Sequence, residues 1–161
     1  LRDSMYINIG KDAGLKREMA VLDGSGLVGI VDEVYDDYSK VLLITSARCK
    51  IGARIVRADS RAVGVVNGRS GIRDMLIMEH IFREASVKNG DIVVTSGYSG
   101  SHPENILIGT VADVRFSNVG LLQEADVVPA ADVADVEYVL VITHFTPEPK
   151  LDKKLQGGQA K

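Results

Sequence analysis

Short apolar runs separated by polar or glycine-containing turns recur along most of the chain. Residues 5–9 alternate and stop at Gly10, and two later runs flank the turn at residues 23–26, which predicts a β-hairpin. Residues 74–80 fit either a helix or a strand, and their short length between polar neighbours favours a strand. The pattern predicts strands at residues 5–9, 19–22, 27–34, 40–45, 49–57, 62–68, 74–80, 92–95, 106–114, 114–116, 121–125 and 137–143.

So many short strands, without a long amphipathic helix, predict an all-β protein with little helix. The motif Gly-x-Val-x-x-Val occurs at residues 29–34 and again at residues 109–114. Any two hairpins rich in Val and Gly share such features, so coincidence is one interpretation. The other is two small β-barrels of about six strands each. We then expect residues 5–62 plus 127–145 in the first barrel, 63–126 in the second, and a disordered tail at 146–161.

Composition narrows the functional classes. Of the 161 residues, 45% are apolar and 25% charged, as in globular rather than disordered chains. No run of aliphatic residues exceeds four, whereas a membrane span needs roughly 20 apolar residues. The net charge of −3 argues against nucleic-acid binding. The single Cys49 excludes an internal disulfide, and the start at Leu1 suggests a fragment of a longer protein.

A double barrel raises the possibility of a serine hydrolase, which needs a serine, a histidine base and an oxyanion site. Ser25 and Ser96 lie in ordinary turn sequences, and neither stands in a Gly-Asp-Ser-Gly setting. The three histidines, His80, His102 and His144, have no ligand-spaced histidine or cysteine partner for a metal. The sequence therefore predicts no enzyme, with no catalytic, cofactor-binding or metal-binding residues.

Several segments, in order, resemble the rod shape-determining MreC family. The most specific one runs from Asn89 through Gly97, continues through residues 102–106 and ends at residues 108–111. It departs from the family in one place, because His102 stands before Pro103 where members usually carry an aromatic residue. The other similar segments are residues 6–16, 19–31, 40–45, 128–133 and 139–141.

The resemblance implies a non-catalytic scaffold of bacterial cell-wall elongation that maintains rod shape. Its implied partners are MreB, MreD, a class B penicillin-binding protein and other wall synthases, together with further copies of itself. It also implies a single-pass membrane protein whose N-terminal helix and coiled coil are absent here, with this domain on the extracytoplasmic side. The alternatives from other classes are a chymotrypsin-like hydrolase and a glycan-binding module; the absence of tryptophan counts against the latter.

A scaffold acts through exposed aromatic or apolar side chains. Tyr35 and Tyr38 flank two aspartates in a predicted loop, and Tyr98 and His102 lie in the long loop before residue 106. These four residues are the predicted partner-binding positions. The alternatives are rings folded back over a barrel rim, and a solvated loop held by Pro103. We assign the motif residues Thr95, Ser96, Gly97 and Gly109 to turn geometry rather than to partner contact.

Overall fold

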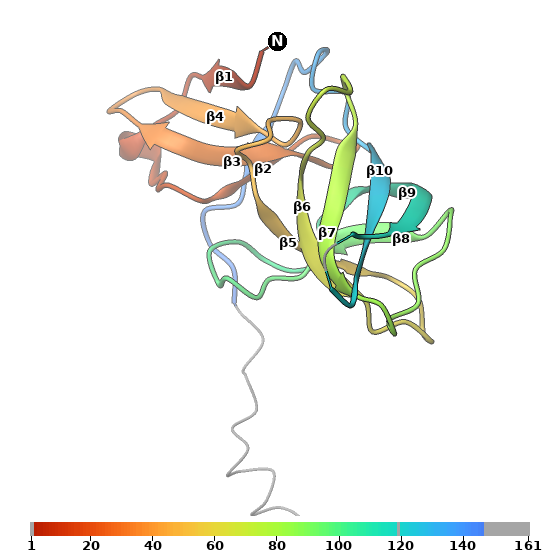
Figure 1. Ribbon diagram of the computed structural model, residues 1–161. Coiled ribbons are helices and arrows are strands. Elements are labelled where there is room, and N and C mark those ends of the chain that lie inside the picture. The colour runs from red at the N-terminus through yellow and green to blue at the C-terminus, as the bar shows by residue number, and fades with distance from the viewer. Residues whose placement is uncertain (1, 119, 147–161) are drawn as a thin grey trace, which may run out of the picture.

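The computed structural model describes residues 2–118 and 120–146 and places their strands in two sheets (Figure 1). The only helix in these residues is the 3-10 turn η1, Lys11–Ala13. The strands are β1 (Ser4–Ile7), β2 (Ala20–Leu22), β3 (Leu27–Val34), β4 (Ser39–Leu43), β5 (Ile51–Ile55), β6 (Val63–Gly68), β7 (Leu76–Phe82), β8 (Ile92–Thr95), β9 (Leu107–Phe116), β10 (Leu122–Pro129) and β11 (Leu140–Val141). The all-β prediction is confirmed, and residues 76–82 form a strand.

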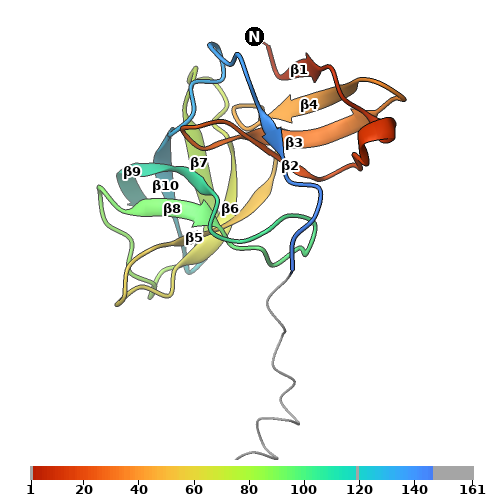
Figure 2. The same ribbon diagram turned by 180° about the vertical axis from the view of Figure 1, so that it is seen from behind.

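The first sheet has five strands in the order β1-β4-β3-β2-β11, all antiparallel. Its centre is the β3–β4 pair, which buries Val28, Val31 and Leu43 almost completely. Figure 2 shows the C-terminal strand β11 beside β2, at one edge of this sheet. The strand predicted at residues 137–143 is therefore shorter than expected and forms an edge. The first unit is an open sheet of five strands, which we expected to be a barrel of about six.

The second sheet closes into a barrel of six strands, in the order β10-β7-β6-β5-β8-β9. Inward and outward positions alternate along β5, where Ile51, Ala53 and Ile55 are buried, as a half-buried strand requires. Leu76, Met78 and Ile108 fill the interior from other strands and are fully buried. The barrel is therefore packed with side chains rather than hollow.

The sheets divide at different residues from those we predicted. The boundary at residue 62 places β5 in the first unit, but β5 pairs with β6 and β8 inside the barrel. Residues 127–129, also assigned to the first unit, complete β10, which pairs with β7 and β9. Barrel closure is the physical reason, because without β5 the β6 and β8 strands would each have a free edge. The predicted tail lies outside the described residues from residue 147 onwards.

One apolar core joins the two sheets, with buried residues from both in a single cluster. The connections between them are tight. The Gly68 amide of β6 donates to the Ser46 carbonyl at 3.0 Å, and a Cβ on Gly68 would lie 1.9 Å from the Thr45 carbonyl oxygen. Only glycine fits there, so the link between β4 and β5 is held directly against the barrel.

Candidate interaction surfaces

Three exposed tyrosines gather at the outer end of the open sheet, and we call them the tyrosine surface: Tyr6, Tyr35 and Tyr38. The rings of Tyr35 and Tyr38 stack with centroids 4.5 Å apart and planes 15° from parallel. The Tyr6 ring lies 6.2 Å from that of Tyr38 and is tilted by 49°. All three side chains are exposed, by 63%, 41% and 43% in chain order. The structure thus brings together two of the predicted residues, and the rings contact one another while facing solvent.

Sequence reasoning missed Tyr6, which lies in β1. Its neighbour in the sheet is Lys40 of β4, two residues after Tyr38, and this register places Tyr6 and Tyr38 on the same face. Tyr6 is exposed and points away from the buried Ile7, as alternation along a strand requires. Only the β1–β4 pairing, which connects residues more than 30 positions apart, reveals which side chains Tyr6 joins.

Backbone contacts hold the β3–β4 turn in place under these rings. The amide of Lys11 donates to the Tyr35 carbonyl at 2.7 Å, and the amide of Asp12 donates to the Asp36 carbonyl at 3.0 Å. The approach is so close that a Cβ on Gly10 would lie 2.2 Å from the Tyr35 carbonyl oxygen. The tyrosine surface is therefore preformed, and a partner does not have to order it on binding.

The surroundings of the tyrosine surface are polar. The Tyr35 hydroxyl donates to Glu33 Oε2 at 2.9 Å, and this hydrogen bond, with the carboxylate charge, raises the pKa of Tyr35 above its usual value. A shallow depression beside the ring is lined by Arg17, Asp32, Glu33, Val34 and Tyr35. Exposed rings beside fixed polar groups are typical of protein contact sites, where tyrosine combines apolar area with a hydrogen-bonding group.

The structure does not bring together the other two predicted residues, Tyr98 and His102. Tyr98 is 67% exposed, whereas His102 is 5% exposed and its Nδ1 has no hydrogen-bond partner within the described residues. The loop folds back on Thr95, whose Oγ1 donates to the Pro103 carbonyl at 2.8 Å and accepts from the Ile106 amide at 3.0 Å. A buried His102 presents no ring to a partner, so the expectation of direct contact at this residue is corrected. Partner contact at Tyr98 stays a prediction.

Among the described residues, neither candidate serine of a hydrolase is paired with a histidine. Ser25 is exposed in a turn closed by its own amide, which donates to Asp23 Oδ1 at 2.8 Å, while Ser96 is buried. Neither hydroxyl is hydrogen bonded to a histidine within residues 2–118 and 120–146. Burial raises the pKa of the Cys49 thiol to about 12, so Cys49 is a core residue and not a nucleophile.

No group of three or more His, Cys, Asp or Glu side chains among the described residues is arranged to hold a metal ion. In those residues we also find no helix with the length and apolar character of a membrane span.

One closed six-strand barrel and one open five-strand sheet, with aromatic side chains exposed on the surface, define this chain as an all-β barrel domain. The family comparison is more specific. The family model described as "Rod shape-determining protein MreC, barrel core" matches residues 1–143. The chain belongs to the MreC family, as the resemblance predicted.

Individual relatives agree with this assignment. The chain is 34% identical to the cell shape-determining protein MreC of Listeria monocytogenes, over 98% of this chain and 55% of the relative. A solved structure of the Listeria MreC superposes with a TM-score of 0.83 at 30% identity, covering 93% of this chain and 72% of that one. The chain spans about half the length of the curated relatives it matches, 55% of the Listeria protein and 49% of that of Bacillus subtilis.

Two more distant structures share the fold alone, because their identities are below 25%. One is described as the major periplasmic domain of the cell shape-determining filament MreC, with TM-score 0.71 and 24% identity over 80% of this chain and 78% of that one. The other is a complex between penicillin-binding protein PBP2 and MreC from Helicobacter pylori, with TM-score 0.59 and 18% identity over 71% of this chain and 68% of that one.

Proposed function

We propose that this chain is the extracytoplasmic part of a non-catalytic scaffold that maintains rod shape in bacterial cell-wall elongation. It binds a class B penicillin-binding protein, and other wall synthases, and it associates with further copies of itself. Membership of the MreC family supports this function. The observation that carries it is the tyrosine surface, a preformed aromatic contact site on a fold with no assembled catalytic group among the described residues.

The solved neighbours support both kinds of partner. The H. pylori MreC was captured with PBP2, and another MreC is described as a filament. We extend those associations to this chain as part of the proposal. The whole protein would also contact MreB and MreD and would be anchored in the cell membrane by one N-terminal helix, with this domain on its outer side.

A pull-down tests the synthase contact. The chain is immobilised and exposed to the extracytoplasmic region of a class B penicillin-binding protein. Hot-spot aromatics contribute 2 kcal/mol or more to binding, so Tyr35→Ala combined with Tyr38→Ala is expected to weaken binding by about thirtyfold. The matched control is Tyr138→Ala, because Tyr138 is 87% exposed and lies two residues before β11, at the opposite edge of the open sheet from β1.

Three outcomes would count against the proposal. Unchanged binding by the Tyr35 and Tyr38 variant would remove the tyrosine surface from the synthase contact. Saturable binding of soluble peptidoglycan fragments that is lost in the same variant, without synthase binding by the native chain, would favour the glycan-binding alternative. Labelling of Ser25 or Ser96 by a fluorophosphonate probe would support the hydrolase alternative instead.

A further inference from the structure

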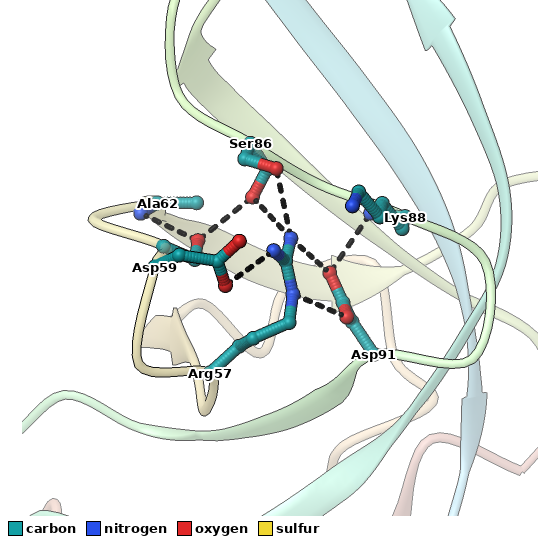
Figure 3. A network of polar contacts seen from close by, with 7 residues as sticks. Arg57, Asp59, Ala62, Ser86, Lys88 and Asp91 are labelled. Atoms are coloured by element: carbon teal, nitrogen blue, oxygen red, sulfur yellow. Dashed lines mark hydrogen bonds and ion pairs between the residues drawn. The ribbon is translucent and has the colours of Figure 1, made fainter.

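The main polar network of the barrel uses its hydrogen-bonding groups internally (Figure 3). The Arg57 guanidinium donates to both carboxylate oxygens of Asp91, at 3.0 and 3.2 Å, and to the Ser86 hydroxyl at 2.9 Å. The amide of Lys88 donates to the same Asp91 carboxylate at 2.8 Å. The barrel strands also pair with neighbours on both sides, because the barrel is closed. Strand backbone that a partner could pair with therefore lies in the open sheet, at its two edges β1 and β11.

The outer side of β1 presents unpaired backbone groups. On the inner side, the amide of Leu43 in β4 donates to the Asp3 carbonyl at 2.9 Å, and Met5, two residues further on, faces β4 in the same way. Backbone groups alternate between the two sides of a strand, so the amides and carbonyls of Ser4 and Tyr6 point away from the sheet. No other strand of the described residues pairs with this side of β1. With four residues against two, β1 is also a longer edge than β11.

The β1 edge lacks the features that usually prevent an edge strand from pairing with another chain. Residues 4–10 contain no charged side chain and no proline. The register of β1 against β4 is continuous, whereas the β2–β3 and β3–β4 pairs both contain a register shift. Natural edge strands are commonly protected by charges, prolines or bulges. The β1 edge is therefore regular enough to accept a further strand.

Contacts at both ends hold β1 in place. Before the strand, Asp3 Oδ2 lies 3.1 Å from Arg48 Nη2. At its last residue, the Ile7 side chain is buried in the apolar core. After the strand, the Lys11 amide donates to the Tyr35 carbonyl at 2.7 Å. A partner that pairs with β1 therefore does not have to order this edge on binding.

The side chains on the two faces of β1 define the chemistry of the added segment. Tyr6 is exposed on the outer face, beside the Tyr38 ring, whereas Met5 on the inner face is partly buried against the core. Side chains of a strand added beside β1 alternate between these two faces. One set contacts the Tyr6 ring, where aromatic and β-branched residues are favoured, and the other set covers the open side of Met5. The segment that fits is extended, uncharged and apolar on both faces.

We propose that the partner of the tyrosine surface contributes an extended, uncharged and apolar segment that adds to the open sheet beside β1 as a sixth strand. Ser4 and Tyr6 together offer two amides and two carbonyls, so the added strand forms up to four backbone hydrogen bonds. Backbone pairing provides the affinity, and the contacts with Tyr6 and Met5 select the side chains. This inference rests on the synthase contact in the proposed function, and the added segment belongs to the synthase.

Amide hydrogen exchange tests the pairing directly. The whole chain is measured alone and with the extracytoplasmic region of a class B penicillin-binding protein. The amides of Ser4 and Tyr6 are expected to exchange at least about tenfold more slowly in the complex, because each then donates to the added strand. The Val141 amide is the control at the other edge. It points outward from β11, because the next residue, Ile142, donates to the Ala20 carbonyl of β2, and its exchange is expected to stay unchanged.

A proline variant tests the same hydrogen bonds by binding. Ser4→Pro removes one outward amide and keeps every tyrosine, and an edge strand tolerates proline where the amide faces outward. It is expected to weaken synthase binding about tenfold, because the facing carbonyl of the synthase is left unpaired. Ser4→Ala is the matched control, since it keeps the amide, and is expected to bind within about twofold of the native chain. Thermal unfolding establishes that both variants are folded, and the exchange measurement on the native chain needs no variant.

The possible failures are distinct. If the synthase binds without slowing exchange at Ser4 and Tyr6, or if Ser4→Pro binds as well as Ser4→Ala, strand addition at β1 is overturned. The variant of Tyr35 and Tyr38 then still tests the proposed synthase contact. Slower exchange at Val141 instead of Ser4 and Tyr6 also overturns the assignment, because the segment then pairs with β11. A native chain that does not bind the synthase overturns the proposed contact and the strand addition together.

Discussion

The Thr95 hydroxyl should be the main stabilising contact of the long loop before β9. Thr95 is fully buried, and its Oγ1 serves both the Ile106 amide and the Pro103 carbonyl. Thr95→Val keeps the shape and removes both hydrogen bonds. The Ile106 residue is buried, so its unpaired amide costs about 1–3 kcal/mol, whereas the half-buried Pro103 carbonyl regains water for less. We expect a total loss of about 2–3 kcal/mol.

Urea unfolding and a thermal scan measure this loss. At about 2–4 °C per kcal/mol for a chain of this size, Thr95→Val should lower the Tm by about 4–12 °C. Thr95→Ser is the matched control, because it keeps the hydroxyl and loses one buried methyl, which costs about 1 kcal/mol. The Ile106 amide should also exchange with solvent faster in Thr95→Val than in Thr95→Ser. A valine variant as stable as the serine variant would refute the assignment of this loop to hydrogen bonding.

Three further predictions concern other parts of the chain. Gly10→Ala puts a Cβ against the Tyr35 carbonyl oxygen and should lower the free energy of unfolding in urea by about 1–3 kcal/mol. It should also weaken synthase binding, although every tyrosine is retained. The Cys49 thiol, with its pKa raised to about 12 by burial, should resist iodoacetamide at pH 8 in the native chain and react fully in urea. The hydrogen bond from Arg57 holds the pKa of Asp59 below its usual value of 3.8. The Arg57–Asp59 pair therefore stabilises the fold fully above pH 3.8, and this stabilisation is lost as the pH falls through the lowered pKa. The Tm difference between the native chain and Asp59→Asn should therefore shrink as the pH falls below 3.8.

Local sequence pattern was sufficient for the strands but not for their assignment to sheets. Alternation and glycine turns predicted most of the strands, including residues 76–82, because each depends on neighbours within a few positions. The place of β5 depends on its pairing with β8, some 40 residues later, and on the β10–β7 pair that completes the barrel. The local pattern of β5 would be the same at the end of the first unit or at the start of the second. No short stretch of sequence can therefore assign β5 to one of the two sheets.

The candidate site shows the same limit. Tyr35 and Tyr38 were predicted because both lie in one turn, whereas Tyr6 joins them only through the register of β1. His102 was placed on the surface because Gly, Ser and Pro surround it, which is typical of a solvated loop. The loop instead folds back on the Thr95 hydroxyl and buries the ring. The residue that holds the loop is Thr95, seven residues before His102, and no local sequence pattern links the two residues.

The two sheets leave different surfaces for a partner. The closed barrel has no free strand edge, so its outer contacts depend on side chains rather than on strand pairing. The tyrosine surface lies on β1 and the β3–β4 turn, at one edge of the open sheet, whereas β11 lies at the other edge. A synthase that docks on the tyrosine rings should therefore lose little affinity on Tyr138→Ala, since Tyr138 lies two residues before β11. Equal losses in this control and in the Tyr35 and Tyr38 variant would mean that the synthase contacts both edges of the open sheet.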